Sequence, residues 1–123
     1  MAEETTLYDA TGKPVAYIDH DNESTIYSFD GKPLAYIDTN GHVYGFNGKH
    51  LGWFQGNIIW DHDGNRAGFT KDTSPVYTQY EPYKGHKQYK PYKGYKEYAP
   101  FQPFKSSSTS KQPLIELLAR GCE

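Results

Sequence analysis

Two short segments combine histidine with aspartate, side chains that bind metal ions or transfer protons. They are Asp19-His20-Asp21 and Asp61-His62-Asp63-Gly64. In an extended strand neighbouring side chains point to opposite faces, so His62 would not converge with the aspartates on either side. A calcium loop also requires a distal glutamate that does not follow. We interpret the second segment as a polar turn, and the sequence predicts neither a metal site nor a cofactor.

The patterns of nucleophilic catalysis are missing from the sequence. It contains no Gly-x-Ser-x-Gly motif and no phosphate-binding glycine loop. No histidine has an obvious nucleophilic partner, and the single cysteine, Cys122, lies one residue from the C-terminus. We therefore predict no catalytic residues and a chain that is not an enzyme.

A pattern centred on a turn glycine occurs four times. The elements that it predicts would position the aspartate and histidine side chains. The glycines are Gly12, Gly31, Gly48 and Gly64, spaced by 19, 17 and 16 residues. Aromatic and branched residues flank each glycine, and Asp-Gly is typical of a two-residue type I′ hairpin turn. Isolated hairpins are marginally stable in water, so the four must pack together. The pattern predicts an all-β fold of four consecutive hairpins over residues 5–73, after an N-terminal arm of residues 1–4.

Strand alternation predicts two different faces for each hairpin. A two-residue loop pairs position −4, counted from the glycine, with +3, and position −5 with +4. Position −5 is branched and +4 is alanine or glycine, which indicates either backbones converging on an axis or room for a neighbouring ring. The +5 aromatics could form the core or a platform for a quaternary ammonium or a sugar. These possible ligand-facing residues are Tyr17, Tyr36, Trp53 and Phe69.

The copies share the pattern Tyr-x-x-x-Gly-Lys-x-x-Ala-Tyr-Ile, which resembles the four-fold β-flower domain, a bacterial family. The resemblance covers residues 5–72. It implies four hairpins arranged as petals around a pseudo-four-fold axis, often followed by a proline-rich, basic tail. It implies no catalytic residues and no established activity. The fourth copy departs most from the pattern, at His62, Arg66 and Thr70.

Residues 74–105 change in composition and repeat every nine residues, with a proline at the third position of each repeat from residue 80. This composition favours an extended, polyproline-II-like backbone of three residues per turn, in which side chains three apart share an edge. Serine-rich residues 106–112 read as a flexible spacer. The sequence of residues 113–121 predicts a short helix. A helix of this length is not stable alone, so it must dock through its apolar face. The predicted partner-binding residues are Tyr80, Tyr83, Tyr89, Tyr92, Tyr95, Tyr98, Lys84, Lys90, Lys93, Leu114, Leu117 and Leu118.

The formal net charge of −2 conceals an asymmetry along the chain. Residues 1–73 carry five basic and eleven acidic side chains, and residues 74–123 carry eight and four. The tail is therefore expected to lie across its own domain or to meet a separate acidic partner. The N-terminus does not resemble a secretion signal and no apolar stretch is long enough to span a membrane, so the expected location is cytoplasmic.

Three functional hypotheses follow from these features. The first is a non-enzymatic structural or protein-interaction module, whose tail straps onto a partner or its own domain within a larger assembly. A protein partner or self-association is expected, with no obligatory small molecule. The second is a small-ligand or saccharide binder that uses the hairpin aromatics. The third is single-stranded nucleic-acid binding through the Tyr/Lys tail, which the acidic domain and the modest charge of the tail disfavour.

Overall fold

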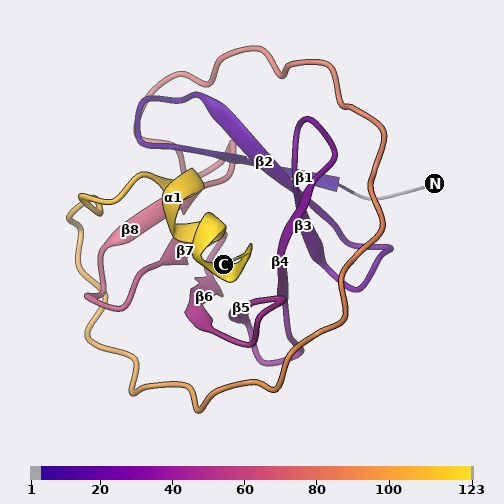
Figure 1. Cartoon of the computed structure of the whole chain (residues 1–123). Coiled ribbons are helices and arrows are strands. Elements are labelled where there is room, and N and C mark those ends of the chain that lie inside the picture. The colour runs from indigo at the N-terminus through magenta and orange to yellow at the C-terminus, as the bar shows by residue number, and fades with distance from the viewer. Residues whose placement is uncertain (1–3, 123) are drawn as a thin grey trace.

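Each of the four repeats folds as an antiparallel hairpin, and every strand also pairs with a strand of a neighbouring repeat. In the computed structural model, which describes residues 4–122, the eight strands form a closed barrel in sequence order (Figure 1). Tyr8 pairs with Phe69 and closes the barrel, which confirms the all-β prediction. The strands are β1 (Glu4–Tyr8), β2 (Pro14–Asp19), β3 (Thr25–Ser28), β4 (Pro33–Ile37), β5 (His42–Gly45), β6 (His50–Gln55), β7 (Ile58–Trp60) and β8 (Arg66–Phe69).

The hairpin turns differ from the predicted type I′ turn. Gly12 has a φ of 83°, whereas Thr11 before it is not in the positive-φ region. The Asp9 N–H donates to the Lys13 carbonyl oxygen at 2.9 Å, which is the pattern of a longer loop with a glycine bulge. The bulge shifts the register, so Tyr8 pairs with Pro14 at +2 rather than with the residue at +3.

The same bulge recurs in all four hairpins, and the predicted pairing of −5 with +4 holds in each one. Positive φ at two consecutive residues, which a type I′ turn requires, occurs instead at two joints between hairpins: at Glu23 and Ser24 before β3, and at the joint between β6 and β7. There Gly56 has a φ of 60° and Asn57 a φ of 62°.

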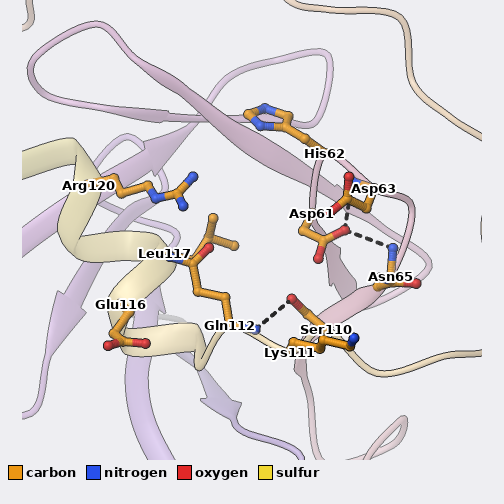
Figure 2. A pocket seen from close by; sticks show the side chains of 10 residues that line it. All are labelled: Asp61, His62, Asp63, Asn65, Ser110, Lys111, Gln112, Glu116, Leu117 and Arg120. Atoms are coloured by element: carbon orange, nitrogen blue, oxygen red, sulfur yellow. Dashed lines mark hydrogen bonds between the residues drawn. The ribbon is translucent and has the colours of Figure 1, made fainter.

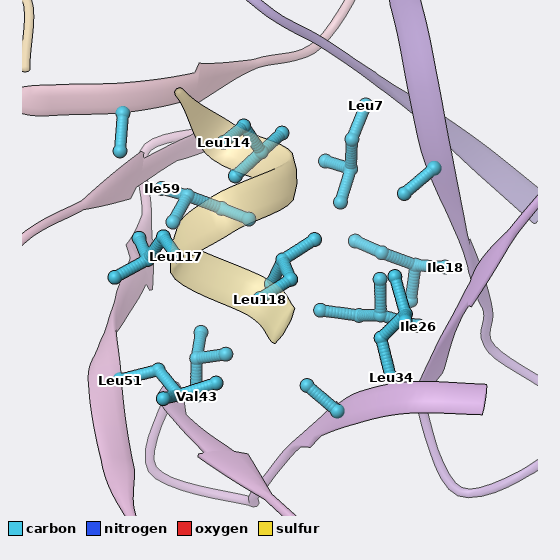
Figure 3. Close-up of a cluster of buried hydrophobic side chains, with 13 residues drawn as sticks. Leu7, Ile18, Ile26, Leu34, Val43, Leu51, Ile59, Leu114, Leu117 and Leu118 are labelled. Atoms are coloured by element: carbon cyan, nitrogen blue, oxygen red, sulfur yellow. The ribbon is translucent and has the colours of Figure 1, made fainter. Parts of the chain in front are cut away.

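The core of the barrel is completed by the short helix α1 (Leu114–Ala119), which is followed by the 3₁₀ turn η1 (Arg120–Cys122). Leu114, Leu117 and Leu118 are at most 2% exposed and pack against the branched residues at position −5 (Figure 3). A Cβ on Gly68 would lie 2.8 Å from the Leu114 side chain, so the small residue at +4 leaves room for the helix. The axis of the barrel is therefore occupied by α1.

The segment between the barrel and α1 encircles the barrel. We call residues 74–105 the strap, and Figure 1 shows this segment running around the outside of the strands before the chain turns inward to α1. Within residues 106–112, expected to be a flexible spacer, residues 108–110 pair with Arg66 of β8. The Arg66 N–H donates to the Ser108 carbonyl oxygen at 2.9 Å, and the Ser110 N–H donates to the Arg66 carbonyl oxygen at 2.8 Å.

Within residues 4–122, neither α1 nor η1 has the length and apolar character needed to cross a membrane.

Candidate functional site

The strap is held at the tip of every hairpin by one recurring hydrogen bond. Backbone N–H groups nine residues apart, three in the strap and one at Ser106 directly after it, donate to the carbonyl oxygens of the four turn glycines at distances between 2.9 and 3.0 Å. Each nine-residue repeat of the strap therefore spans one hairpin. The pairs are Gln79 with Gly12, Gln88 with Gly31, Glu97 with Gly48, and Ser106 with Gly64.

The turn glycines also allow the strap backbone to approach closely. A Cβ on Gly31 would lie 1.9 Å from the His86 carbonyl oxygen, and one on Gly48 would lie 2.0 Å from that of Tyr95. Both glycines also have φ above 90°, a conformation that other residues rarely adopt. The glycines that make the turns are thus also the points where the strap rests on the barrel.

The lysines of the strap point toward the barrel and bind its carboxylates. Lys84 and Lys87 contact Glu4 at 2.7 and 3.1 Å, and Lys87 also contacts the buried carboxylate of Asp19 at 2.6 Å. Lys90 and Lys93 contact the exposed Glu23, and the Lys93 Nζ lies 4.4 Å from the ring centroid of Tyr36. The predicted partner-binding lysines Lys84, Lys90 and Lys93 therefore bind the chain's own barrel.

These ion pairs change the pKa values of their members. The hydrogen bond from Lys84 lowers the pKa of Glu4, with a further contribution from Lys87. For Lys87, burial lowers the pKa, but hydrogen bonds to Asp19 and Glu4 outweigh burial and raise it above its ordinary value. The folded chain thus favours the charged form of both groups.

The aromatic residues at +5 do not form an open ligand platform. Tyr17, Tyr36, Trp53 and Phe69 are at most 3% exposed. Tyr17 packs between neighbouring hairpins, 5.8 Å from Tyr27 between ring centroids, and strap lysines cover it from outside. The sequence left two alternatives for these four residues, a core or a ligand platform, and their burial favours the core. In a chain with few aliphatic residues the rings form part of the buried structure.

The structure places the other predicted partner-binding residues in two very different settings. Leu114, Leu117 and Leu118 lie inside the barrel, so the apolar face of the helix docks on its own domain. The six predicted tyrosines lie on the outward edge of the strap, each at least 94% exposed. We call this edge the aromatic row. Its members are Tyr77, Tyr80, Tyr83, Tyr89, Tyr92, Tyr95, Tyr98, Phe101 and Phe104.

A polar pocket of about 670 Å³ lies between the β7–β8 turn and α1 (Figure 2). Its walls carry both signs of charge, including Asp63, Glu116 and Arg120. Asp61 accepts the backbone N–H groups of Asp63 and Asn65 at 2.9 and 2.8 Å, as expected for a polar turn. Among residues 4–122 no group of three or more His, Cys, Asp or Glu side chains is arranged to hold a metal ion.

Three histidines that the sequence did not bring together form a hydrogen-bonded row. The His42 Nδ1 lies 2.9 Å from the His50 Nε2, and the His50 Nδ1 lies 2.9 Å from the His62 Nε2. His50 is 2% exposed, and burial lowers its pKa to about 4, with contributions from His62 and His42. An alignment of the four repeats would have given the only sequence signal for this row. In that alignment His62 occupies the position of Phe29 and Phe46.

A family profile described as the 4-fold beta flower protein matches residues 5–118. The chain belongs to this family. The match extends beyond the hairpins, through the strap and into α1, so the β-flower unit includes the segments that wrap and fill the barrel. The β-flower family is not a known enzyme family. No curated protein and no solved structure matches the chain.

Proposed function

We propose that the chain is a non-enzymatic interaction module that binds a protein partner through the aromatic row. The observation that supports this proposal is the exposure of the row, between 94% and 102% for every member. Large apolar side chains that stay exposed along one continuous edge of a protein are typical of binding sites. Tyrosine and phenylalanine are also enriched in protein interfaces, and the tyrosine hydroxyl can still reach a polar group.

The spacing of the row supports a role separate from holding the strap. Contacts between strap and barrel recur every nine residues, as the hairpins require. The aromatic residues recur every three, and nine of the ten positions from Tyr77 to Phe104 follow this rule, with His86 as the exception. Since these rings extend away from the barrel, packing on the barrel does not explain their type.

The attachment of the strap favours binding by the row. An extended backbone fixed at four hairpin tips has already lost most of its conformational freedom, so a partner need not order it. Five of the six strap lysines contact barrel carboxylates, which favours a protein partner over phosphate contacts to a nucleic acid. These five are Lys84, Lys87, Lys90, Lys93 and Lys96.

The proposal is tested with a photo-crosslinking amino acid placed at Tyr92 of the full chain, in cells of its source. A matched probe at Lys71, which is exposed but outside the row, is the control. We expect discrete crosslinked protein species from position 92 that disappear when Tyr83 and Tyr98 are changed to serine. Equal crosslinking from position 71, or none from position 92, would overturn the proposal. The serine variants should keep the unfolding midpoint, because the replaced rings are exposed.

A further inference from the structure

The histidine row lies where the strap crosses the third hairpin. His42 begins β5, His50 begins β6, and His62 belongs to the β7–β8 turn. The His50 ring is enclosed by Tyr44 and Trp53, with ring centroids 5.1 and 4.7 Å away. The row therefore links two hairpins through one buried imidazole.

The strap residue Glu97 is fixed at this place by three hydrogen bonds. Its N–H donates to the Gly48 carbonyl oxygen at 3.0 Å, and its carbonyl oxygen accepts the Tyr44 hydroxyl at 3.1 Å. Its side-chain carboxylate accepts the backbone N–H of His50 at 2.7 Å. The middle residue of the histidine row is thus also an attachment point of the strap.

We propose that the histidine row is an acid-sensitive latch, which holds the strap on the third hairpin and opens when a second proton enters the row. In the neutral row each link is one N–H donating to one ring nitrogen, and both links can point the same way. One added proton at an end of the row leaves both links intact. A second proton at the other end makes both nitrogens of one link donors, so that link breaks and two cations lie in one partly buried row.

The charged groups around the row act in opposite directions. Glu97 from the strap and Asp38 before β5 favour the protonated form of His50. Lys49 and Arg120 line the same cleft as His50, His62 and Glu97, and their positive charges oppose protonation. At the far end, Asp61 and Asp63 flank His62 in the turn. Burial is the largest influence on His50, so the middle of the row resists protonation.

The second hairpin supplies an internal control for the latch. Gly85 and Gln88 donate to the carbonyl oxygens of Phe29 and Gly31, as Gly94 and Glu97 donate to those of Phe46 and Gly48 one repeat later. The second hairpin holds its strap segment without a histidine row. Acid should therefore release residues 94–97 while residues 85–88 stay attached.

The experiment measures amide hydrogen exchange of the full chain by NMR as the pH is lowered from 7 to 4, with a chelator present to keep the histidines free of metal. We expect the Glu97 amide to lose at least tenfold protection relative to that of Gln88 as a second histidine of the row titrates. Parallel loss at both amides would show general acid unfolding and overturn the proposal. Independent titration of all three histidines, with no loss at Glu97, would also overturn it.

Two variants taken from the neighbouring repeats distinguish protonation of the histidine row from protonation of the Glu97 carboxylate. His62→Phe introduces the residue found at this position in the second and third hairpins, and it should move the opening to lower pH by about one unit. Glu97→Gln introduces the residue of the preceding strap repeat, Gln88. It should retain the acid opening but move it to a lower pH, because the Glu97 charge favours the protonated form of His50. If Glu97→Gln abolishes the opening, or His62→Phe leaves it unchanged, titration of the carboxylate is the cause and the latch is wrong.

Discussion

The backbone N–H of Gln88 donates to the carbonyl oxygen of Gly31 at 2.9 Å. This bond places the strap directly on the tip of the second hairpin, and its equivalents recur at the other three tips. A repeat of nine residues in the tail and a repeat of about 17 in the barrel thus describe the same four-fold arrangement. Strap, barrel and helix are thus joined by direct contacts.

The turn glycines should be sensitive to substitution for two additive reasons. Gly31→Ala places a Cβ 1.9 Å from the His86 carbonyl oxygen and also strains a residue with a φ of 95°. We expect a loss of at least about 3 kcal/mol in the free energy of unfolding, from backbone strain and displacement of the strap. Urea unfolding gives the energy, and limited proteolysis reports whether the strap has been released.

Gly56→Ala is the matched control for this prediction. Gly56 has a φ of 60°, but a Cβ there would meet nothing within 4 Å. The substitution should cost about 1 kcal/mol from strain alone and leave the strap resistant to protease. Equal losses for the two variants would show that the strap does not rest on Gly31.

The sequence predicted the hairpins well because each local feature is repeated. Alternation, turn glycines and small residues at +4 identified four hairpins, and the pairing of Leu7 with Ala16 followed from them. The bulge was not predicted, because Asp-Gly fits both a type I′ turn and a type I turn with a glycine bulge. The histidine row was not predicted either. His42, His50 and His62 come from three places in the barrel, and only the closed geometry brings them together.

The helix should contribute strongly to stability because it fills the barrel. Leu118 is 0% exposed within the core, so Leu118→Ala should lower the free energy of unfolding by about 2–5 kcal/mol. Ile115 on the same helix is 40% exposed, and Ile115→Ala should change the stability by about 0.5 kcal/mol or less. Thermal and urea unfolding compare the two. Similar small effects would mean that α1 does not occupy the core in solution.

Two buried tyrosines should respond in opposite ways to loss of the hydroxyl. The Tyr36 hydroxyl is buried and has no hydrogen-bond partner among the described residues, so Tyr36→Phe should be neutral or stabilising. The Tyr27 hydroxyl accepts a hydrogen bond from the Asn22 side chain at 2.7 Å, so Tyr27→Phe should cost about 1 kcal/mol. Calorimetry of the two variants measures the difference in stability. A larger loss for Tyr36→Phe than for Tyr27→Phe would contradict this account of the two hydroxyls.

The strap lysines should differ according to the burial of the carboxylate they contact. Lys87→Gln leaves the buried carboxylate of Asp19 without its cation and should cost about 2 kcal/mol. Lys90→Gln removes a contact to Glu23, which is 64% exposed, and should change the free energy of unfolding much less. Unfolding at low and high salt measures both costs, and equal costs would contradict the prediction.

The ion pairs at Glu4 should also make the stability depend on pH. The pKa of Glu4 is lower in the folded chain than its ordinary value of 4.5, so the unfolded chain binds its proton more readily. The stabilisation is present above pH 4.5 and is lost as the pH falls through the folded pKa. Glu4→Gln should remove this part of the acid sensitivity, which a series of unfolding curves between pH 3 and 7 would detect.

The most direct test of the account is amide hydrogen exchange along the strap of the full chain at neutral pH. Between residues 79 and 106, the structure gives backbone hydrogen bonds to the hairpins at Gln79, Gly85, Gln88, Gly94, Glu97 and Ser106. We expect protection at these amides, with a period of nine along the strap, and rapid exchange at Tyr83, Tyr92 and Tyr98. Rapid exchange at all strap amides would contradict the claim that the strap encircles its own barrel.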